Sequence, residues 1–467
     1  MSTSPADPYA ALGRAAAHAI AYRRDIAQAE RTPTVDYDAI HALFDGPVPQ
    51  QGENGDAIIE ELATLAQPGI RASTAPRFFG WVIGNSHPTG VAADWLTAAW
   101  GQNAANVSAA PAASAVEAVA ARWLLELLDL PREASIGFVT GATVANLVCL
   151  AAARSEMLRR RGWDVEADGL IGAPALPVLA GADAHATIFT ALKILGLGAR
   201  QVMLIDTDEQ GRMIPAALET AIAGLDVPPI VIAQAGQINT GATDPFDAIA
   251  PLVAAAGGWL HVDGAFGLWA QASPTLRHQT HGIDQADSWA TDGHKWLQTP
   301  YDSGFAIVRD AQAHRRAMAI SASYLPPADA GQRDPSDYVI ELSRRARGFA
   351  TWAMIRQMGR EGIAAMLEQC CAVAAHVGEA LGRIEGVDLR APVVLNQAIL
   401  RFGDDAQTLA VIAAVQADAV AYVGASQWRG EWVMRVSVSS SATTMADANL
   451  AIASIARCWE AVRKGVA

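Results

Sequence analysis

Hydrophobic and polar positions follow two alternating patterns through the middle of the chain. Short apolar runs rich in Val, Ile and Leu are typical of buried strands, and they occur at 202–205, 230–233, 259–263 and 304–308. The helical spacing of apolar residues at 215–223 separates two of these runs. Strands that alternate with helices indicate an α/β fold, in which helices flank a mostly parallel central sheet.

The two ends of the chain show different patterns. Alanines recur with helical spacing at 10–29 and 57–65, which predicts a helical arm that cannot bury its apolar stripe alone. We predict a helix that opens at Glu341 and ends at Met358. After about residue 361, helical stretches alternate with predicted strands at 396–402 and 432–437. At 467 residues the chain exceeds one ordinary core. We therefore predict an N-terminal helical arm, a large domain and a small C-terminal α/β domain, with bounds 1–65, 66–360 and 361–467.

Composition excludes several classes of protein. With 51% hydrophobic and 18% charged residues the chain is typical of a globular protein. A net charge of −14 argues against a nucleic-acid partner, which would need a basic face. The four cysteines lack metal-ligand spacing, so we expect no metal and a reducing compartment. Without a basic and apolar leader, or an apolar run near the ~20 residues that span a bilayer, we expect no membrane contact and a cytoplasmic protein.

The stretch 261–296 contains the strongest candidate site. Asp263 ends a predicted strand, and ligands in open α/β sheets gather at such ends. A buried carboxylate needs a cationic partner, and a protonated pyridine nitrogen is suitable. Ala265 shares the side of Asp263 in an extended segment, and its methyl group lets a flat ring lie close. Both residues would address one planar ligand.

Lys295 supplies a nucleophile to the same stretch. Only Lys193, Lys295 and Lys464 are lysines among 34 basic residues. An amine held among His294, Trp296 and Leu297 would be partly desolvated, which lowers its pKa and favours imine formation. The alternative is a lysine whose stem is buried at a strand edge while its charge reaches water.

An anion site is predicted where a strand runs through a glycine turn into a long helix. Gly141, Ala142 and Thr143 form this turn. Unpaired amides at the helix start and the hydroxyl of Thr143 suit a phosphate. Neither a nucleotide-triphosphate loop nor a dinucleotide fingerprint is present in the sequence.

Taken in their order along the chain, these motifs resemble those of the pyridoxal-phosphate-dependent group II amino-acid decarboxylases, the family of aromatic amino-acid and glutamate decarboxylases. The resemblance runs from about residue 76 to about 359. It implies the aspartate-aminotransferase-like fold of fold type I and pyridoxal 5'-phosphate bound to Lys295 as an aldimine. It also implies that His185 and Ala265 sandwich the cofactor ring, and that Asp292 and His294 bind the cofactor.

The resemblance assigns further residues to the reaction and to substrate binding. Tyr324 would reprotonate the substrate carbon, within a loop at 321–338 that is typical of a lid. In this family the segment that corresponds to 1–65 wraps around a second subunit, so we expect a homodimer; an arm folded on its own domain stays open as the alternative. Ser343 would reach the phosphate from the neighbouring subunit, which places the active sites at the interface. The candidates for substrate binding are Arg77, Phe79 and Asn103. For Arg77 a structural ion pair, and for Phe79 ordinary core packing, stay open as alternatives.

The predicted reaction is the decarboxylation of an L-amino acid to its amine and CO₂. The cofactor can labilise other bonds, so a lyase, a transaminase or an oxidative deaminase remains an alternative. A catalytically silent protein that has kept the fold is another. Tyr324 favours simple decarboxylation, whereas Asn103 and Asn106, where aromatic decarboxylases have bulky apolar residues, leave the substrate side chain open.

Overall fold

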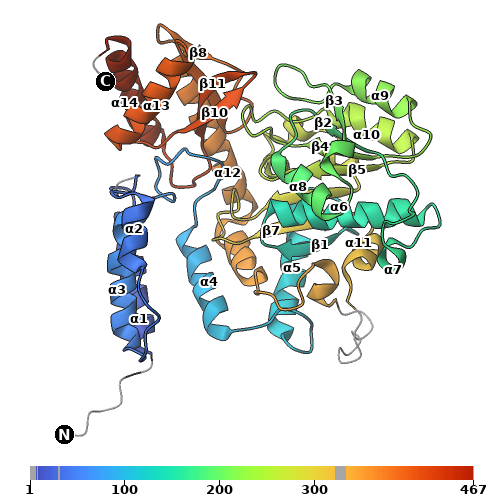
Figure 1. The fold of residues 1–467 in the computed structure, drawn as a ribbon, viewed down its shortest axis with the longest axis horizontal. Helices are drawn as coiled ribbons and strands as arrows, with labels where there is room; N and C mark the ends of the chain where they lie inside the picture. The colour runs from blue at the N-terminus through green and yellow to red at the C-terminus, as the bar shows by residue number, and fades with distance from the viewer. Residues whose placement is uncertain (1–6, 8, 30–31, 321–332, 466–467) are drawn as a thin grey trace.

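The structure, a computed structural model, describes residues 7, 9–29, 32–320 and 333–465. Within these residues the strands form two sheets, which lie apart from each other in Figure 1. The large sheet has the strand order β1-β7-β6-β5-β4-β2-β3. Its strands are β1 (Ser135–Val139), β2 (Val178–Gly181), β3 (Met203–Ile205), β4 (Ile230–Gln234), β5 (Trp259–Asp263), β6 (Ser288–Asp292) and β7 (Gly304–Val308).

The large sheet is mostly parallel, as the sequence predicts. β2 pairs in parallel with β3 and β4, β4 with β5, and β5 with β6, whereas β7 is antiparallel to both of its neighbours. β5 is buried throughout because it lies in the middle of a sheet covered on both faces. The parallel pairing brings the carboxyl ends of β4, β5 and β6 to one edge, where Gln234, Asp263 and Asp292 stand.

Helices cover both faces of this sheet (Figure 1). α6 follows β1 directly and packs across β5, β6 and β7. The first helices of this part of the chain are α4 (Pro88–Trp100), which packs on α12 and not on the sheet, α5 (Pro111–Leu127), α6 (Ala142–Arg159) and α7 (Val165–Asp168). The others are α8 (Ala186–Ile194), α9 (Pro215–Ala223), α10 (Phe246–Ala255) and α11 (Ala311–Met318).

The C-terminal part carries an antiparallel sheet of order β10-β11-β9-β8. Its elements are β8 (Val387–Leu389), β9 (Gln397–Phe402), α13 (Asp405–Asp418), β10 (Gly424–Trp428), β11 (Glu431–Ser437) and α14 (Met445–Arg463). The sequence predicted β9 and β11 but missed β8 and β10, which are short and half exposed. The domain bounds at 65 and 360 stay a prediction.

The long helix α12 (Gly348–Gly382) joins the two sheets and corrects one expectation. We expected a helix to open at Glu341, but 341–347 is irregular. Arg344, Arg345 and Arg347 each pair with a carboxylate on a different segment, which a regular helix could not allow. The predicted helix end at 358 corresponds to a break inside α12, where Gly359 has a φ of 62°.

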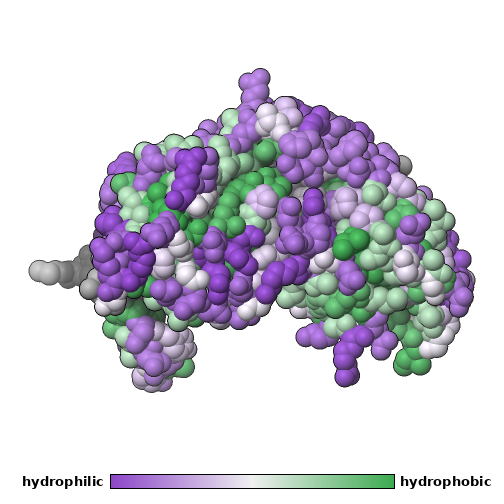
Figure 2. All heavy atoms as spheres, turned by 90° about the horizontal axis from the view of Figure 1, so that it is seen from above, coloured by the Kyte–Doolittle hydropathy of each residue, from purple (hydrophilic) through white to green (hydrophobic). Residues whose placement is uncertain are grey.

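The N-terminal arm consists of α1 (Ala10–Asp25), α2 (Tyr37–Phe44) and α3 (Gly55–Ala66). None of their residues is buried in this chain, and Figure 1 shows the arm standing apart from both sheets, beside α4. Exposed ion pairs join α1 to α3, among them Arg14 with Asp56 at 3.0 Å. Figure 2 shows apolar patches among hydrophilic ones on the face it presents.

Two kinds of feature are absent from the described residues. No helix in them is long and apolar enough to cross a membrane. The same residues hold no cluster of His, Cys, Asp and Glu that could bind a metal ion.

Candidate active site

A cavity of about 360 Å³ opens at the carboxyl edge of the large sheet. Side chains that follow β1, β2, β5 and β6 line it, because parallel strands end at the same edge. The structure thereby brings together most of the predicted cofactor residues. These are Gly141, Ala142, Thr143, His185, Asp263, Ala265, Asp292, His294 and Lys295.

Asp263 faces this cavity from the end of β5 and is 7% exposed. Its Oδ1 accepts a hydrogen bond from the backbone amide of Ala265 at 3.2 Å, and its Oδ2 accepts one from Nδ2 of Asn146 at 3.2 Å. Burial raises the pKa of this carboxyl, while positive charge on His185 or Lys295 opposes the rise. The carboxylate is therefore suited to a cationic ligand atom, as the sequence predicted.

Lys295 forms an ion pair with Asp292. Its Nζ lies 2.9 Å from Oδ2 of Asp292, and Oδ1 of the same carboxylate accepts the backbone amide of Ala142 at 2.6 Å. This carboxylate thus joins the end of β6 to the start of α6. Asp292 and Lys295 are three residues apart, on either side of the turn after β6. Their ion pair holds the amine of Lys295 at the cavity wall.

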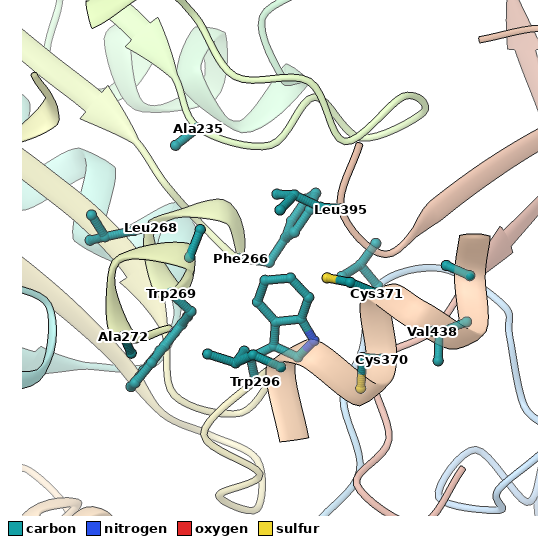
Figure 3. Packing of buried hydrophobic residues seen from close by; sticks show 14 of the residues in the cluster. Ala235, Phe266, Leu268, Trp269, Ala272, Trp296, Cys370, Cys371, Leu395 and Val438 are labelled. Atoms are coloured by element: carbon teal, nitrogen blue, oxygen red, sulfur yellow. The ribbon is translucent and has the colours of Figure 1, made fainter. Parts of the chain in front are cut away.

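The neighbours of Lys295 in the sequence lie elsewhere than expected. Trp296 and Leu297 are fully buried and point into the core, so they do not enclose the amine. Figure 3 shows Trp296 between Phe266 on one side and Cys370 and Cys371 of α12 on the other. The rings of Phe266 and Trp296 meet edge to face at 5.8 Å. Trp296 therefore holds the backbone next to Lys295 by packing against Phe266 and α12.

His294 has a defined orientation beside the amine. Its Nδ1 accepts the backbone amide of Ser303 at 3.3 Å, which leaves Nε2 as the donor, 3.5 Å from Oδ1 of Asp292. Burial lowers the pKa of His294. Its ring lies 4.2 Å from that of Tyr301, which also lines the cavity.

The predicted anion site lies at the start of α6, which borders the cavity. Gly141 at the N-cap contributes no capping side chain. The amide of Ala142 is donated to Asp292, so the amides that follow Ala142 in the first turn are the ones suited to an anion. A methyl group at Gly141 would lie 3.0 Å from Cε1 of His294, and one at Gly304 would lie 2.4 Å from the Cα of Gly141. Only glycines allow this close approach of β7 and the turn.

His185 caps α8 and borders the cavity. Thr187 donates its backbone amide to Nδ1 of His185 at 3.4 Å, and the hydroxyl of Thr187 lies 2.8 Å from the same atom. These contacts fix the ring at the border of the cavity. Burial lowers the pKa of His185, and the carboxylate of Asp263 opposes this change.

The cavity also contains residues that the sequence did not single out. Gln234, Phe266 and Tyr301 line it, and burial raises the pKa of Tyr301 to about 12. Gln234 ends β4, so the rule that ligands gather at strand ends could have found it. Phe266 and Tyr301 stand in irregular segments, and no spacing pattern identifies such positions.

Other predicted residues lie away from this cavity within the chain. Arg77 takes the alternative that the sequence left open, an ion pair with Asp447 at 2.8 Å. Phe79 is 1% exposed in the core. Asn103 accepts the backbone amide of Arg344 at 2.9 Å, and Ser343 is exposed. Tyr324 lies outside the described residues.

Residues 38–393 match the family model described as the pyridoxal-dependent decarboxylase conserved domain. Tryptophan decarboxylase 1 of Oryza sativa subsp. japonica is 31% identical over 325 residues, which cover 65% of this chain and 62% of the rice protein. Aromatic-L-amino-acid decarboxylase of Bacillus atrophaeus is 28% identical over 79% of this chain and 76% of its own. Cysteine sulfinic acid decarboxylase of Mus musculus is 29% identical over 75% of this chain and 72% of its own.

Solved structures share the fold at lower identity. The crystal structure of mouse CSAD superposes with a TM-score of 0.89 at 23% identity, covering 98% of this chain and 99% of the mouse chain. The crystal structure of Oryza sativa TDC with PLP and tryptamine gives 0.88 at 24% identity, covering 100% and 99%. The predicted fold of type I is therefore confirmed.

Proposed function

The chain belongs to the pyridoxal-dependent decarboxylase family, a family of pyridoxal-phosphate-dependent carboxy-lyases, and we propose that it converts an L-amino acid to its amine and CO₂. Lys295 would carry the cofactor through a covalent bond to its ε-amino group. One observation supports this proposal most strongly: Lys295, Asp263 and the start of α6 face the same cavity.

The residues around this cavity fit pyridoxal phosphate. The amides that follow Ala142 at the start of α6 and the hydroxyl of Thr143 suit the phosphate, and Asp263 suits the ring nitrogen. Ala265 and His185 would lie on opposite faces of the ring. A cavity of about 360 Å³ is in the usual range for small-molecule sites.

When bound, the cofactor supplies a protonated pyridine ring that takes up the electron pair left by departing CO₂. Asp263 would keep the ring nitrogen protonated, because a buried carboxylate favours a cation beside it. Asp292 would orient the amine of Lys295 through the 2.9 Å ion pair. His185, fixed by Thr187, would keep water from the face that it covers.

The proton that the substrate carbon receives needs a donor. We retain Tyr324 as the predicted donor on the resemblance alone, within the loop at 321–338. The described end of that segment contains a short 3-10 helix at Pro335–Tyr338, and we retain a role for the loop in excluding water.

Arg435 on β11 is a candidate partner for a negative group of the substrate. It is 8% exposed, and no carboxylate of the described residues lies within 4.0 Å of its guanidinium. Its Nη1 lies 3.3 Å from the carbonyl oxygen of Ile238, a residue of the cavity wall. Burial lowers the pKa of Arg435 to about 10. A buried cation without a paired charge favours an anionic ligand.

We further propose a homodimer in a reducing, cytoplasmic compartment. The arm and α4 expose large apolar side chains, which a second subunit could cover: Leu12, Tyr37, Leu43, Phe44, Leu62, Trp95, Leu96 and Trp100. Ser343 and Asn103 would then act across the interface. The four cysteines are free and buried. Light scattering of the purified protein should give twice the mass of one chain, and a monomer would contradict the dimer.

A panel of L-amino acids tests the reaction. Holoprotein is incubated with aromatic, acidic and aliphatic amino acids, and CO₂, amine, aldehyde and ammonia are measured. We expect one CO₂ for each amine from at least one substrate, without ammonia. Ammonia and aldehyde as the main products would contradict simple decarboxylation, and cofactor binding without turnover of any substrate would favour a silent binding protein.

A further inference from the structure

A row of buried polar side chains leads from Asp263 into the interior, away from the cavity. Nδ2 of Asn146 donates to Asp263 at 3.2 Å, and Oδ1 of Asn146 lies 2.9 Å from Nε2 of His261. Nδ1 of His261 lies 2.9 Å from Oγ of Ser288, which accepts the indole N–H of Trp259 at 2.9 Å. Asn146, His261 and Ser288 have no exposed surface.

The donors in this row have one consistent direction. An indole N–H only donates, so the hydroxyl oxygen of Ser288 accepts from Trp259 and its hydrogen is free for Nδ1 of His261. Burial lowers the pKa of His261 to about 3, so its ring is neutral and carries one proton, on Nε2. That proton is donated to Oδ1 of Asn146, and the amide of Asn146 is donated to Asp263.

The opposite direction would leave groups unsatisfied. The amide oxygen of Asn146 would then face an acceptor oxygen of Asp263, which is tolerable only when that carboxyl is protonated. The hydroxyl hydrogen of Ser288 would also lose its acceptor. The first order gives each of these contacts one donor and one acceptor, and it ends on an acceptor at the cavity wall.

We propose that Asn146 and His261 are positioning residues that hold Asp263 as an ionised hydrogen-bond acceptor facing the ring nitrogen of the cofactor. The inference rests on the proposed function, because pyridoxal phosphate brings that nitrogen. Burial alone favours the neutral carboxyl, and hydrogen bonds donated to the carboxylate oppose this. The row therefore supports the charge that keeps the ring nitrogen protonated.

A second buried histidine supplies a matched comparison. His314 has no exposed surface, and its Nδ1 lies 2.8 Å from Oγ of Ser135. Its Nε2 lies 3.0 Å from the backbone carbonyl oxygen of Tyr338. This contact joins two segments and ends on a backbone atom, and none of the three residues lines the cavity. The two histidines share burial and a serine partner, and they differ in the last acceptor.

The experiment compares two cofactors on apoprotein. Dissociation constants are measured by equilibrium dialysis for pyridoxal phosphate and for its 1-deaza analogue, in which carbon replaces the ring nitrogen. The analogue keeps the aldehyde and phosphate but cannot be protonated opposite Asp263. The ratio of the two constants therefore reports the interaction of Asp263 with the ring nitrogen, and a general loss of folding would change both constants together.

The variants divide the row into its parts. Asn146→Leu keeps the volume and removes the donor, so the preference for pyridoxal phosphate should fall about tenfold or more. His261→Leu should lower it in the same direction. His261→Gln should retain it, since a glutamine amide can donate to Asn146 while its oxygen accepts from Ser288. His314→Leu, the matched control, should leave the ratio unchanged.

The outcomes separate this inference from the proposed function. Cooperative unfolding of the Asn146→Leu apoprotein would show that the variant is folded. If this folded variant keeps the wild-type ratio of the two dissociation constants, the inference is wrong. Asn146→Ala, which has no side-chain donor, gives the same reading should the leucine variant not fold. A wild type that binds both cofactors equally contradicts the role of Asp263 at the ring nitrogen and overturns the inference. A wild type that binds neither contradicts the proposed function itself.

Discussion

Two ion pairs of similar length lie in very different surroundings. Arg344, which stands in the segment before α12, forms an ion pair with Glu117 at 2.8 Å, and both side chains are 0% exposed. Lys295 and Asp292 meet at 2.9 Å with the lysine side chain 16% exposed, because it borders the cavity. The same chemistry thus occurs once in a closed site and once in an open one.

The difference separates a structural charge from a reactive one. Arg344 also donates to the backbone carbonyls of Ala104 and Phe138, so protein groups surround it. The amine of Lys295 has a carboxylate on one side and the cavity on the other. A closed pair can only join segments, whereas an open pair leaves an atom available to a ligand. The variants below test this contrast, in order of decreasing effect.

Removal of the primary amine at Lys295 should have the largest effect. We expect Lys295→Ala and Lys295→Arg to lower kcat by about four orders of magnitude or more, as for other covalent nucleophiles. The arginine keeps the positive charge beside Asp292 but lacks a primary amine. Lys193→Ala, which changes an exposed residue of α8, should keep its activity. Steady-state assays of CO₂ release provide the measurement, and an active Lys295→Arg variant would contradict the reactive role.

Opening the closed pair should lower stability and leave chemistry largely intact. Glu117→Ala leaves the charge of Arg344 buried without its carboxylate, which should reduce the free energy of unfolding by about 3–5 kcal/mol. Urea unfolding is the measurement, with kcat of the folded fraction falling less than about tenfold. Glu379→Ala removes an exposed pair with Arg383 on α12 and should cost below about 1 kcal/mol. Equal losses in the two variants would refute the contrast.

Neutralising the carboxylate at the end of β5 should lower the rate with little loss of fold. Asp263→Asn keeps the shape but removes the charge opposite the ring nitrogen, and we expect kcat to fall by about 10²- to 10³-fold. Asp287→Asn is the matched control, since Asp287 accepts the amide of Leu260 at 2.7 Å near the opposite end of β5. A fall in kcat of similar size in both variants would remove the special role of Asp263.

The smallest expected effect concerns a cluster at the far end of α6. Contacts with Arg159, then Arg160, lower the pKa of Glu156 from 4.5 to about 2. A carboxyl with a lowered pKa stabilises the fold above its ordinary value and loses that contribution as the pH falls toward 2. Glu156→Gln should cost about 1 kcal/mol at pH 7, allowing for solvent screening. Unfolding at pH 7 and near pH 2.5 should show the difference shrinking; a constant difference would contradict the pairing.

The parts of the fold that sequence could predict depend on local pattern. β5 and α9 have the bounds that apolar runs and helical spacing suggested. Asp263 was found because strand ends in parallel sheets have a known place relative to ligands. The turn at Gly141 was found because a glycine between a strand and a helix is typical of turns that present backbone amides to an anion.

The remaining features depend on contacts between distant segments. Trp296 was expected beside the amine, but packing against α12 turns it into the core. Arg435 reaches the site wall from another sheet, about 140 residues after Lys295. Asn146 and His261 are ordinary in their own helix and strand, and only the fold brings them within 2.9 Å. No periodicity encodes such pairings.

The position of the covalent bond tests the central claim most directly. Holoprotein is reduced with borohydride, digested and analysed by mass spectrometry, and the chain offers only Lys193, Lys295 and Lys464 as modified lysines. We predict a phosphopyridoxyl group on the peptide that contains Lys295 and on neither of the other two. Reduced holoprotein with an unmodified Lys295 would contradict the account.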